Sequence, residues 1–296
     1  AVDEDDEEKQ GSLFLHGVKG ARMGQPPRTV PIFVTPPFLC EFASDMLRGS
    51  GWNGGSVSMS LPVVSKVLEA VLEPPEESPP LFAELWKEFA FSTDELQALN
   101  KVSKVLRDGS KLSQKFKLAE RGGPQLVQFL KLMKKRTAEL QVGDSMVVPG
   151  GSSYPHPRVR KESIDVSLMY ILERTSEDSF RFVVVNTDVE GGLGYHQACA
   201  TASAPTIDFK LCMAMDDVPM ARMLDDAWWL FVLKLVKNGN SPSQLYDLLL
   251  PWLTDTPLEE SFAAASEVDF RAPHDNDSSF YRCVSESVFY LLRRQE

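Results

Sequence analysis

Histidine and cysteine are the residues of this chain that are best suited to catalysis or metal binding near neutral pH. The sequence contains four of each, and they are His16, His156, His196, His274, Cys40, Cys199, Cys212 and Cys283. Their spacing matches neither His-Glu-x-x-His nor Cys-x-x-Cys, so a zinc site is not indicated. The sequence also lacks the Gly-x-Ser-x-Gly elbow of an α/β-hydrolase and the Gly-Lys-Ser/Thr of a phosphate-binding loop. We therefore expect no metal and no cofactor.

His196 is the best placed of the histidines, because it follows a glycine-rich loop that comes soon after an apolar run. An isolated histidine in a loop is usually an exposed residue, and we interpret His196 in that way unless a nucleophile lies beside it. Cys283 falls one turn inside the last predicted helix, where a thiol is more often packed than reactive. The sequence therefore supplies candidate groups without placing them next to each other.

Three apolar runs in the second half of the chain must position these groups. They span residues 143–151, 165–174 and 179–188, and they are rich in β-branched and aromatic side chains. The second and third are separated by the polar turn 175–178, which predicts a β-hairpin. Because the longer runs are apolar throughout rather than alternating, we expect a sheet that is covered on both faces.

Helical periodicity dominates the remaining chain. Apolar residues recur at helical spacing in 62–73, 80–91, 92–107, 219–237, 242–250 and 280–294, and again after Pro124. Ser92 and Glu95 form a Ser-x-x-Glu capping box at the start of one of these helices. A further strand is predicted at 207–213, and Trp228 and Trp229 are predicted to lie in the core. The sequence thus predicts an α+β fold, in which a helical N-terminal half packs on an antiparallel β-meander with further C-terminal helices.

The first part of the chain differs in composition from the rest. Residues 1–28 contain an acidic run at 3–8, and we expect them to form a solvated, disordered tail. Prolines follow, and residues 32–34 among them are a candidate short strand for a sheet edge. We expect residues 29–140 to form a helical subdomain that makes one compact unit with the β-meander and helices of 141–296.

Charge and composition exclude several classes of function. The formal net charge of -11 argues against a nucleic-acid binder, since such proteins neutralise phosphate with Lys and Arg. The one basic patch, at residues 131–136, is interpreted as a solvated helix face. The longest apolar run, 227–233, is too short to span a bilayer. Scattered cysteines and an acidic start without a signal sequence predict reduced thiols, in the cytoplasm or another reducing intracellular compartment.

Two separated stretches carry a resemblance to a known family. The hairpin stretch 165–170 is followed by 184–187, which reads Val-Val-Asn-Thr, and the closing stretch 276–283 is a polar loop that leads into a helix carrying Cys283. Together they resemble the hairpin and the nucleophile segment of papain-like cysteine peptidases and their deubiquitinase-type relatives. The resemblance implies a thiol at a helix start, a histidine base, and an Asn that orients the imidazole, which would be Asn186.

The catalytic positions of that family are changed in this sequence. Val166 stands at the histidine position and Ser279 at the nucleophile position, and the order of the two segments is reversed. We therefore expect a non-catalytic protein-interaction or scaffold module, a pseudoenzyme that binds a protein partner or serves as a subunit of a larger complex. The alternative is an active cysteine or serine hydrolase, with Cys283 or Ser279 as nucleophile, His196 or His274 as base, and Asn186 as orienter.

Overall fold

The structure of this chain is a computed structural model. It describes residues 57–72, 92–119, 122–155, 163–189, 192–200, 207–235, 241–255, 270–271 and 279–295. The expected acidic tail, the edge strand at 32–34 and the helix at 80–91 lie outside these residues. So do His16, His156, His274 and Cys40.

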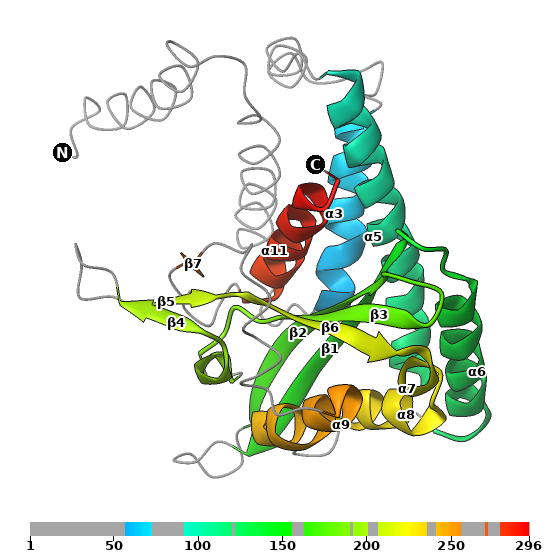
Figure 1. The fold of residues 1–296 in the computed structure, drawn as a ribbon, viewed down its shortest axis with the longest axis vertical. Coiled ribbons are helices and arrows are strands. Elements are labelled where there is room, and N and C mark those ends of the chain that lie inside the picture. Colours follow the sequence, from blue (N-terminus) through cyan, green and yellow to red (C-terminus); the bar gives the residue numbers. More distant parts are fainter. Residues whose placement is uncertain are drawn as a thin grey trace, which may run out of the picture.

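A four-stranded antiparallel sheet forms the centre of the fold (Figure 1). Its strands are β1 (Ser145–Pro155), β2 (Ser163–Arg174), β3 (Ser179–Val185) and β6 (Cys212–Pro219), in the order β1-β2-β3-β6. The first three are consecutive antiparallel neighbours, so the predicted meander is confirmed. The fourth pairs with β3 after the chain has passed through a second sheet.

Successive side chains of the central strands point to opposite faces of the sheet, and both faces are buried. In β2, Leu168 and Tyr170 lie in one apolar core, while Met169 and Ile171 lie in the other. Neither face of a central strand meets water, which explains why the sequence of these strands does not alternate. The expectation of a sheet covered on both faces is confirmed.

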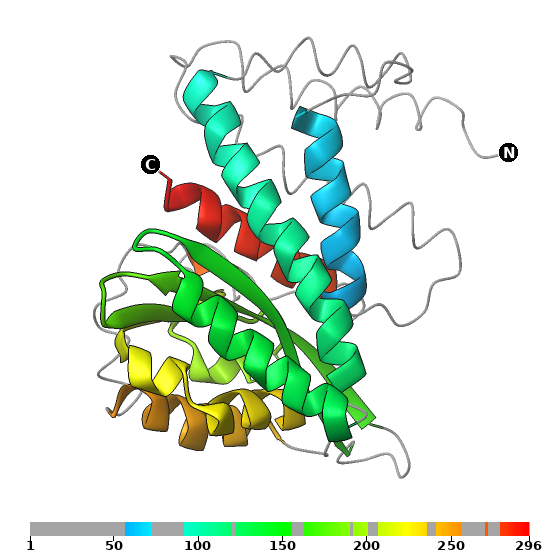
Figure 2. The same ribbon diagram turned by 90° about the vertical axis from the view of Figure 1, so that its right-hand side faces the viewer.

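Helices cover the two faces and give the molecule three layers (Figure 2). One core is closed by α3 (Val57–Leu72), the first part of α5 (Thr93–Ala119) and α11 (Ser279–Arg293). The other is closed by α6 (Gly123–Glu139), α8 (Asp226–Leu235) and α9 (Leu250–Thr254), together with the end of α5. The fold is therefore α+β, with helices from both halves of the chain packed on the meander.

Helix α5 continues well past Arg107, where the sequence predicted its end. Its start is as expected, because Glu95 accepts the backbone N–H of Ser92 at 2.7 Å and Ser92 accepts that of Glu95 at 3.2 Å. Gly109 would ordinarily weaken the helix, but a Cβ at this position would lie 2.2 Å from Val147 Cγ2. The glycine lets α5 cross close to β1, and packing on the sheet overrides its poor helix propensity.

The strand predicted at 207–213 is divided between two sheets. β5 (Ile207–Lys210) pairs with β4 (Ala198–Ala200) and β7 (Phe270–Arg271) in a second sheet, whereas β6 belongs to the central one. Leu211 separates β5 from β6, and its carbonyl accepts the backbone N–H of Asn186 at 2.9 Å. Strand propensity is alike on both sides of Leu211, so the sequence did not reveal the change of sheet.

The helix predicted at 219–237 is also divided, into α7 (Met220–Met223) and α8. The Asp225 side chain accepts the backbone N–H of Ala227 at 2.8 Å. This hydrogen bond caps the N-terminus of α8, so α8 begins as a separate helix. Trp228 and Trp229 of α8 are both buried, as predicted.

The helix predicted at 242–250 contains a π-helical stretch, η2 (Gln244–Leu249), which leads into α9. Pro251 follows after Leu250, and it has no N–H to donate to the carbonyl four residues earlier. The wider bonding of a π-helix is rare and often occurs at functional sites. This stretch carries Tyr246, around which the candidate site is built.

Candidate functional site

Asn186 directly follows β3, and its side chain is fully buried. Its Oδ1 accepts the backbone N–H of Asp188 at 2.9 Å, which closes an Asx turn and redirects the chain. Its Nδ2 donates to the hydroxyl oxygen of Tyr246 at 3.0 Å. The amide oxygen of Asn186 therefore stabilises the local turn, and its amide nitrogen binds a residue of η2.

The Tyr246 hydroxyl is the centre of a hydrogen-bonded cluster that also contains His196. It lies 2.9 Å from His196 Nε2, while His196 Nδ1 lies 2.7 Å from the carbonyl oxygen of Lys210. A carbonyl only accepts, so Nδ1 carries the ring proton and Nε2 accepts the Tyr246 O–H. The hydrogen bonds thus run in one direction, from the Asn186 amide through the Tyr246 hydroxyl to the imidazole. We call Asn186, His196 and Tyr246 the neutral cluster.

Burial keeps this cluster uncharged. It lowers the pKa of His196 to about 4 and raises the pKa of Tyr246 far above neutral pH. His196 is only 3% exposed, so its interpretation as a surface residue is wrong. Gly192, with a φ of 90°, turns the chain before the short helix η1 (Leu193–Tyr195), and a Cβ at Gly192 would lie 2.8 Å from Tyr246 Cε2. The loop therefore folds closely onto η2 and takes the imidazole into the interior.

Cys283 lies in the second turn of α11 and is fully buried, which confirms the expectation of a packed thiol. Its Sγ is 3.2 Å from the carbonyl oxygen of Ser167 and 3.4 Å from Thr187 Oγ1. Burial raises the pKa of the Cys283 thiol to about 12, although the Thr187 hydrogen bond acts in the opposite direction. A thiol with such a pKa is protonated at pH 7 and is a poor nucleophile.

The structure brings Asn186 and His196 together at Tyr246, while the Cys283 thiol bonds to the residues on either side of Asn186. The first two share Tyr246, which lies in the core closed by η2, α8 and α9. Cys283 belongs to the core on the other face of the sheet. His196 is the only histidine among the described residues, and its two ring nitrogens bond to Tyr246 and to a backbone carbonyl.

Of the remaining positions in the family resemblance, the structure describes the side chain of only one. Val166, at the family's histidine position, is packed in the apolar core. Ser279 is the first residue of α11, and its side chain lies outside the described part of the chain, as does the whole of His274. The serine alternative therefore stays a prediction of the sequence.

Tyr246 is the residue that sequence reasoning missed. It stands among the apolar positions of a predicted helix, where it reads as a core residue. A buried tyrosine hydroxyl usually finds a hydrogen-bond partner, and this is the one signal that the sequence offered. The partners come from segments that are distant in sequence, so the pattern around Tyr246 did not identify them.

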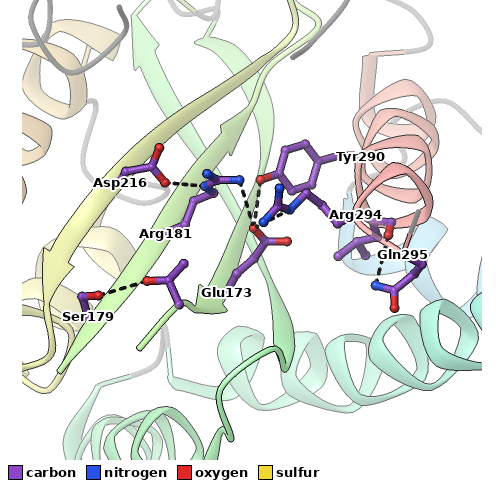
Figure 3. A network of polar contacts seen from close by, with 9 residues as sticks. Glu173, Ser179, Arg181, Asp216, Tyr290, Arg294 and Gln295 are labelled. Atoms are coloured by element: carbon purple, nitrogen blue, oxygen red, sulfur yellow. Dashed lines mark hydrogen bonds and ion pairs between the residues drawn. The ribbon is translucent and has the colours of Figure 1, made fainter. Parts of the chain in front are cut away.

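A second polar cluster fastens α11 to the sheet near the start of β3 (Figure 3). The Glu173 carboxylate accepts the Tyr290 O–H at 3.0 Å and lies 3.5 Å from Arg294 Nε. Arg181 lies 3.9 Å from the same carboxylate and donates to Asp216 of β6. We call Glu173, Arg181, Asp216, Tyr290 and Arg294 the charged cluster.

A β-bulge gives the charged cluster its geometry. Phe180 pairs with Val218 and Phe182 pairs with Met215, so Arg181 faces two residues of β6, and one of these, Asp217, has a φ of 55°. Burial raises the pKa of Glu173, against the opposing effects of Arg294, Tyr290 and Arg181. The groups of this cluster neutralise one another and join three strands to a helix, which is a structural role.

The basic patch of α6 has local partners. Lys134 lies 3.4 Å from Asp226, Lys135 lies 3.7 Å from Glu139, and Arg136 donates to a backbone carbonyl of α5. Pairs as exposed as these contribute little to stability. The patch is therefore a solvated helix face, as its sequence indicated.

Further searches of the described residues give no additional site. Within them, no group of three or more His, Cys, Asp or Glu side chains is placed to hold a metal ion, and no helix is long and apolar enough to cross a membrane. Comparison of the chain with protein-family models, with curated proteins and with solved structures finds no significant match. Function is therefore inferred from the two clusters and from the exposed apolar side chains of the described residues.

Proposed function

We propose that this chain is a non-catalytic protein-interaction module, a pseudoenzyme-like scaffold that serves as a subunit of a larger assembly. The bonding of His196 carries the proposal. Its Nε2 accepts the Tyr246 hydroxyl, its Nδ1 donates to a backbone carbonyl, and burial holds its pKa near 4. An imidazole in this arrangement has no ring nitrogen left with which to activate a nucleophile.

The environment of Cys283 supports the same reading. An active cysteine needs a lowered pKa, which a helix N-terminus and an adjacent imidazolium can provide. Cys283 lies in the second turn of its helix, and burial raises the pKa of its thiol to about 12. The hydrogen-bonding capacity of the thiol is taken up by backbone carbonyls and Thr187.

A binding role fits the surface of the described part of the chain. Large apolar side chains are exposed on separate elements, including Val127 of α6, Phe231 of α8 and Leu248 of η2. Scattered apolar residues are ordinary on protein surfaces. Leu248 is the most exposed of these three side chains, at 64%, and it lies on η2.

The proposal includes a reducing intracellular compartment. The four cysteines are widely spaced in the sequence and form no Cys-x-x-Cys pair. Such scattered cysteines are typical of proteins kept in reducing surroundings.

Alkylation of the folded full chain with iodoacetamide tests the absence of an activated thiol, with the rate at each cysteine read by mass spectrometry. Cys199 is the internal control, because it is exposed. We expect Cys283 to react at least about a hundredfold more slowly than Cys199, since alkylation must wait for local opening and for a thiolate. A ubiquitin-type thiol-reactive probe should leave Cys283 unmodified.

Rapid alkylation of Cys283 that is lost in His196→Ala or His274→Ala would overturn the proposal and establish a cysteine hydrolase. Labelling of Ser279 by a fluorophosphonate would overturn it in favour of a serine hydrolase. Slow reaction at Cys283 together with no label at Ser279 would leave the non-catalytic assignment in place.

A further inference from the structure

The outer face of α5 carries a row of lysine side chains. Between residues 96 and 119 the sequence contains six Lys or Arg and a single carboxylate, although the whole chain has a formal net charge of -11. Four of these lysines are exposed, and their spacing of three, seven and four residues places them on one face of the helix. We call Lys101, Lys104, Lys111 and Lys115 the α5 stripe. Because its members are not consecutive, the stripe does not stand out as a basic run in the sequence.

The stripe lies on a helix that packing holds in place. On the inner side of α5, Leu106 is buried in one core of the sheet and Phe116 in the other. The exposed lysines therefore have a fixed spacing, and Lys104 and Lys115 are about 17 Å apart along the helix axis at a rise of about 1.5 Å per residue.

Little negative charge lies near the stripe. Lys111 is 3.1 Å from Asp108, in a pair whose side chains are 59% and 44% exposed, so this pair contributes little. Lys101 donates to a backbone carbonyl at 3.3 Å, and among the described residues no carboxylate pairs with Lys101, Lys104 or Lys115. Lysines three or four residues apart on a helix repel each other, so an anionic ligand along the stripe is favoured.

The chain itself contains a segment of complementary charge. Residues 3–8 are six consecutive carboxylates, Asp-Glu-Asp-Asp-Glu-Glu. In extended form six residues span about 20 Å, which is close to the length of the stripe from Lys104 to Lys115. Both continue into apolar residues, since Leu-Phe-Leu follows the run at 13–15 and Leu118, next along the exposed face of α5, is 47% exposed. The acidic run and the stripe therefore match in charge and in length.

We infer that residues 3–8 of this chain dock along the α5 stripe as an intramolecular anionic ligand. Carboxylates of the run pair with Lys104, Lys111 and Lys115, and the run thereby occupies a basic surface to which other anionic molecules would otherwise bind. The inference goes beyond the proposed function and does not depend on it.

The connection along the chain permits this contact. The run is followed by residues 9–56 and then by α3, and α3 lies beside α5, with Glu69 3.4 Å from Arg107. At up to about 3.4 Å per residue, residues 9–56 can reach any part of the stripe. A ligand tethered to its own site acts at a high effective concentration, so several weak exposed pairs suffice to hold it there.

Zero-length cross-linking of the full chain tests the inference. A carbodiimide joins a carboxylate to a lysine amine only where the two are in contact, and the linked residues are read by mass spectrometry from the monomer fraction. The wild type is compared with Lys104→Gln/Lys115→Gln. The matched control is Lys131→Gln/Lys135→Gln, which removes the same charge from exposed lysines of α6. Circular dichroism confirms that both variants are folded.

We expect residues 3–8 to be linked to the α5 stripe at least about tenfold more often than to Lys131 and Lys135, because a docked run keeps its carboxylates beside the stripe. The link to Lys111 should fall at least about fivefold in Lys104→Gln/Lys115→Gln and change less than about twofold in the control, since two of the attracting charges are lost only in the former. Salt at about 1 M should abolish the links to the stripe.

A peptide of residues 1–15 measures the same contact in trans by fluorescence anisotropy. It should bind at least about tenfold more tightly to a chain whose own run is neutralised than to the wild type, whose stripe is occupied. The neutralised chain carries Asp3→Asn, Glu4→Gln, Asp5→Asn, Asp6→Asn, Glu7→Gln and Glu8→Gln.

Each contrary result has a separate meaning. Links to α6 as frequent as those to the stripe, or equal affinity of the peptide for the neutralised chain and the wild type, would overturn the docking. Links found only in cross-linked dimers would replace the intramolecular contact with one between two copies of the chain. A single-stranded oligonucleotide that binds the wild type and not Lys104→Gln/Lys115→Gln would overturn the inference in favour of nucleic acid as the occupant.

Discussion

The neutral and charged clusters lie at opposite ends of β3 and on opposite faces of the sheet, and they are built from different chemistry. The neutral cluster joins an amide, a phenol and an imidazole by directed hydrogen bonds, and its three side chains are buried. The charged cluster joins carboxylates to guanidinium groups, and the Arg181 and Arg294 side chains remain 21% and 37% exposed. One end of the strand is therefore ordered by hydrogen-bond geometry and the other by charge.

The comparison shows that burial shifts the pKa of a group in each cluster that can become uncharged. In the neutral cluster burial lowers the pKa of His196, and in the charged cluster it raises the pKa of Glu173. In both cases the folded state favours the uncharged form. The two clusters should consequently respond to pH with opposite signs.

The largest expected difference between the two clusters is a loss of folding stability at acidic pH that is caused by His196. Its pKa falls from 6.5 to about 4 on folding, so between these values the unfolded state binds more protons and stability decreases as the pH falls. The full effect is up to about 3 kcal/mol, present above pH 6.5 and lost by about pH 4. Urea unfolding of the wild type and His196→Gln across this range measures it. An equal pH dependence in both proteins would assign the acid sensitivity to carboxylates.

Removing one tyrosine hydroxyl from each cluster compares how much each hydroxyl contributes to the free energy of unfolding. Tyr246→Phe leaves His196 Nε2 buried without its donor, and we expect a loss of about 2 to 3 kcal/mol in the free energy of unfolding. Tyr290→Phe serves as the matched variant and should cost only about 1 kcal/mol, because Glu173 keeps Arg181 and Arg294. The measurement is urea unfolding at pH 7. Equal losses would show that the charged cluster depends on its hydroxyl as strongly as the neutral one.

The smallest effect is expected from Glu173→Gln. A carboxyl whose pKa is raised on folding contributes stability when protonated, and that contribution is lost as the pH rises above the ordinary range of a glutamate. Gln imitates the protonated form and keeps an acceptor for Tyr290, so we expect a change below about 1 kcal/mol at pH 7. Chemical unfolding at pH 5 and pH 7, at low and high salt, provides the readout. A loss of about 3 kcal/mol or more would mean that the arginines require an ionised partner.

The fold could be predicted further than the candidate site. The meander, its two covered faces and the capping box at Ser92 follow from local patterns and are present in the structure. The end of α5 and the division of the strand at 207–213 were predicted wrongly, because packing of Gly109 against Val147 and the bend at Leu211 are tertiary events. For the site, the sequence identified Asn186 and His196 but misjudged the exposure of His196 and missed Tyr246.

The sequence by itself determined the α+β class, the order of the first three central strands and the apolar residues that cover them, since periodicity and turn chemistry act between near neighbours. Only the tertiary structure decided that His196 is buried, neutral and bonded to Tyr246, from which it is separated by 50 residues. The protonation state of an imidazole depends on what surrounds it, and those surroundings are brought together by folding. The same packing stacked the partly exposed ring of Tyr195 on the buried ring of Tyr246.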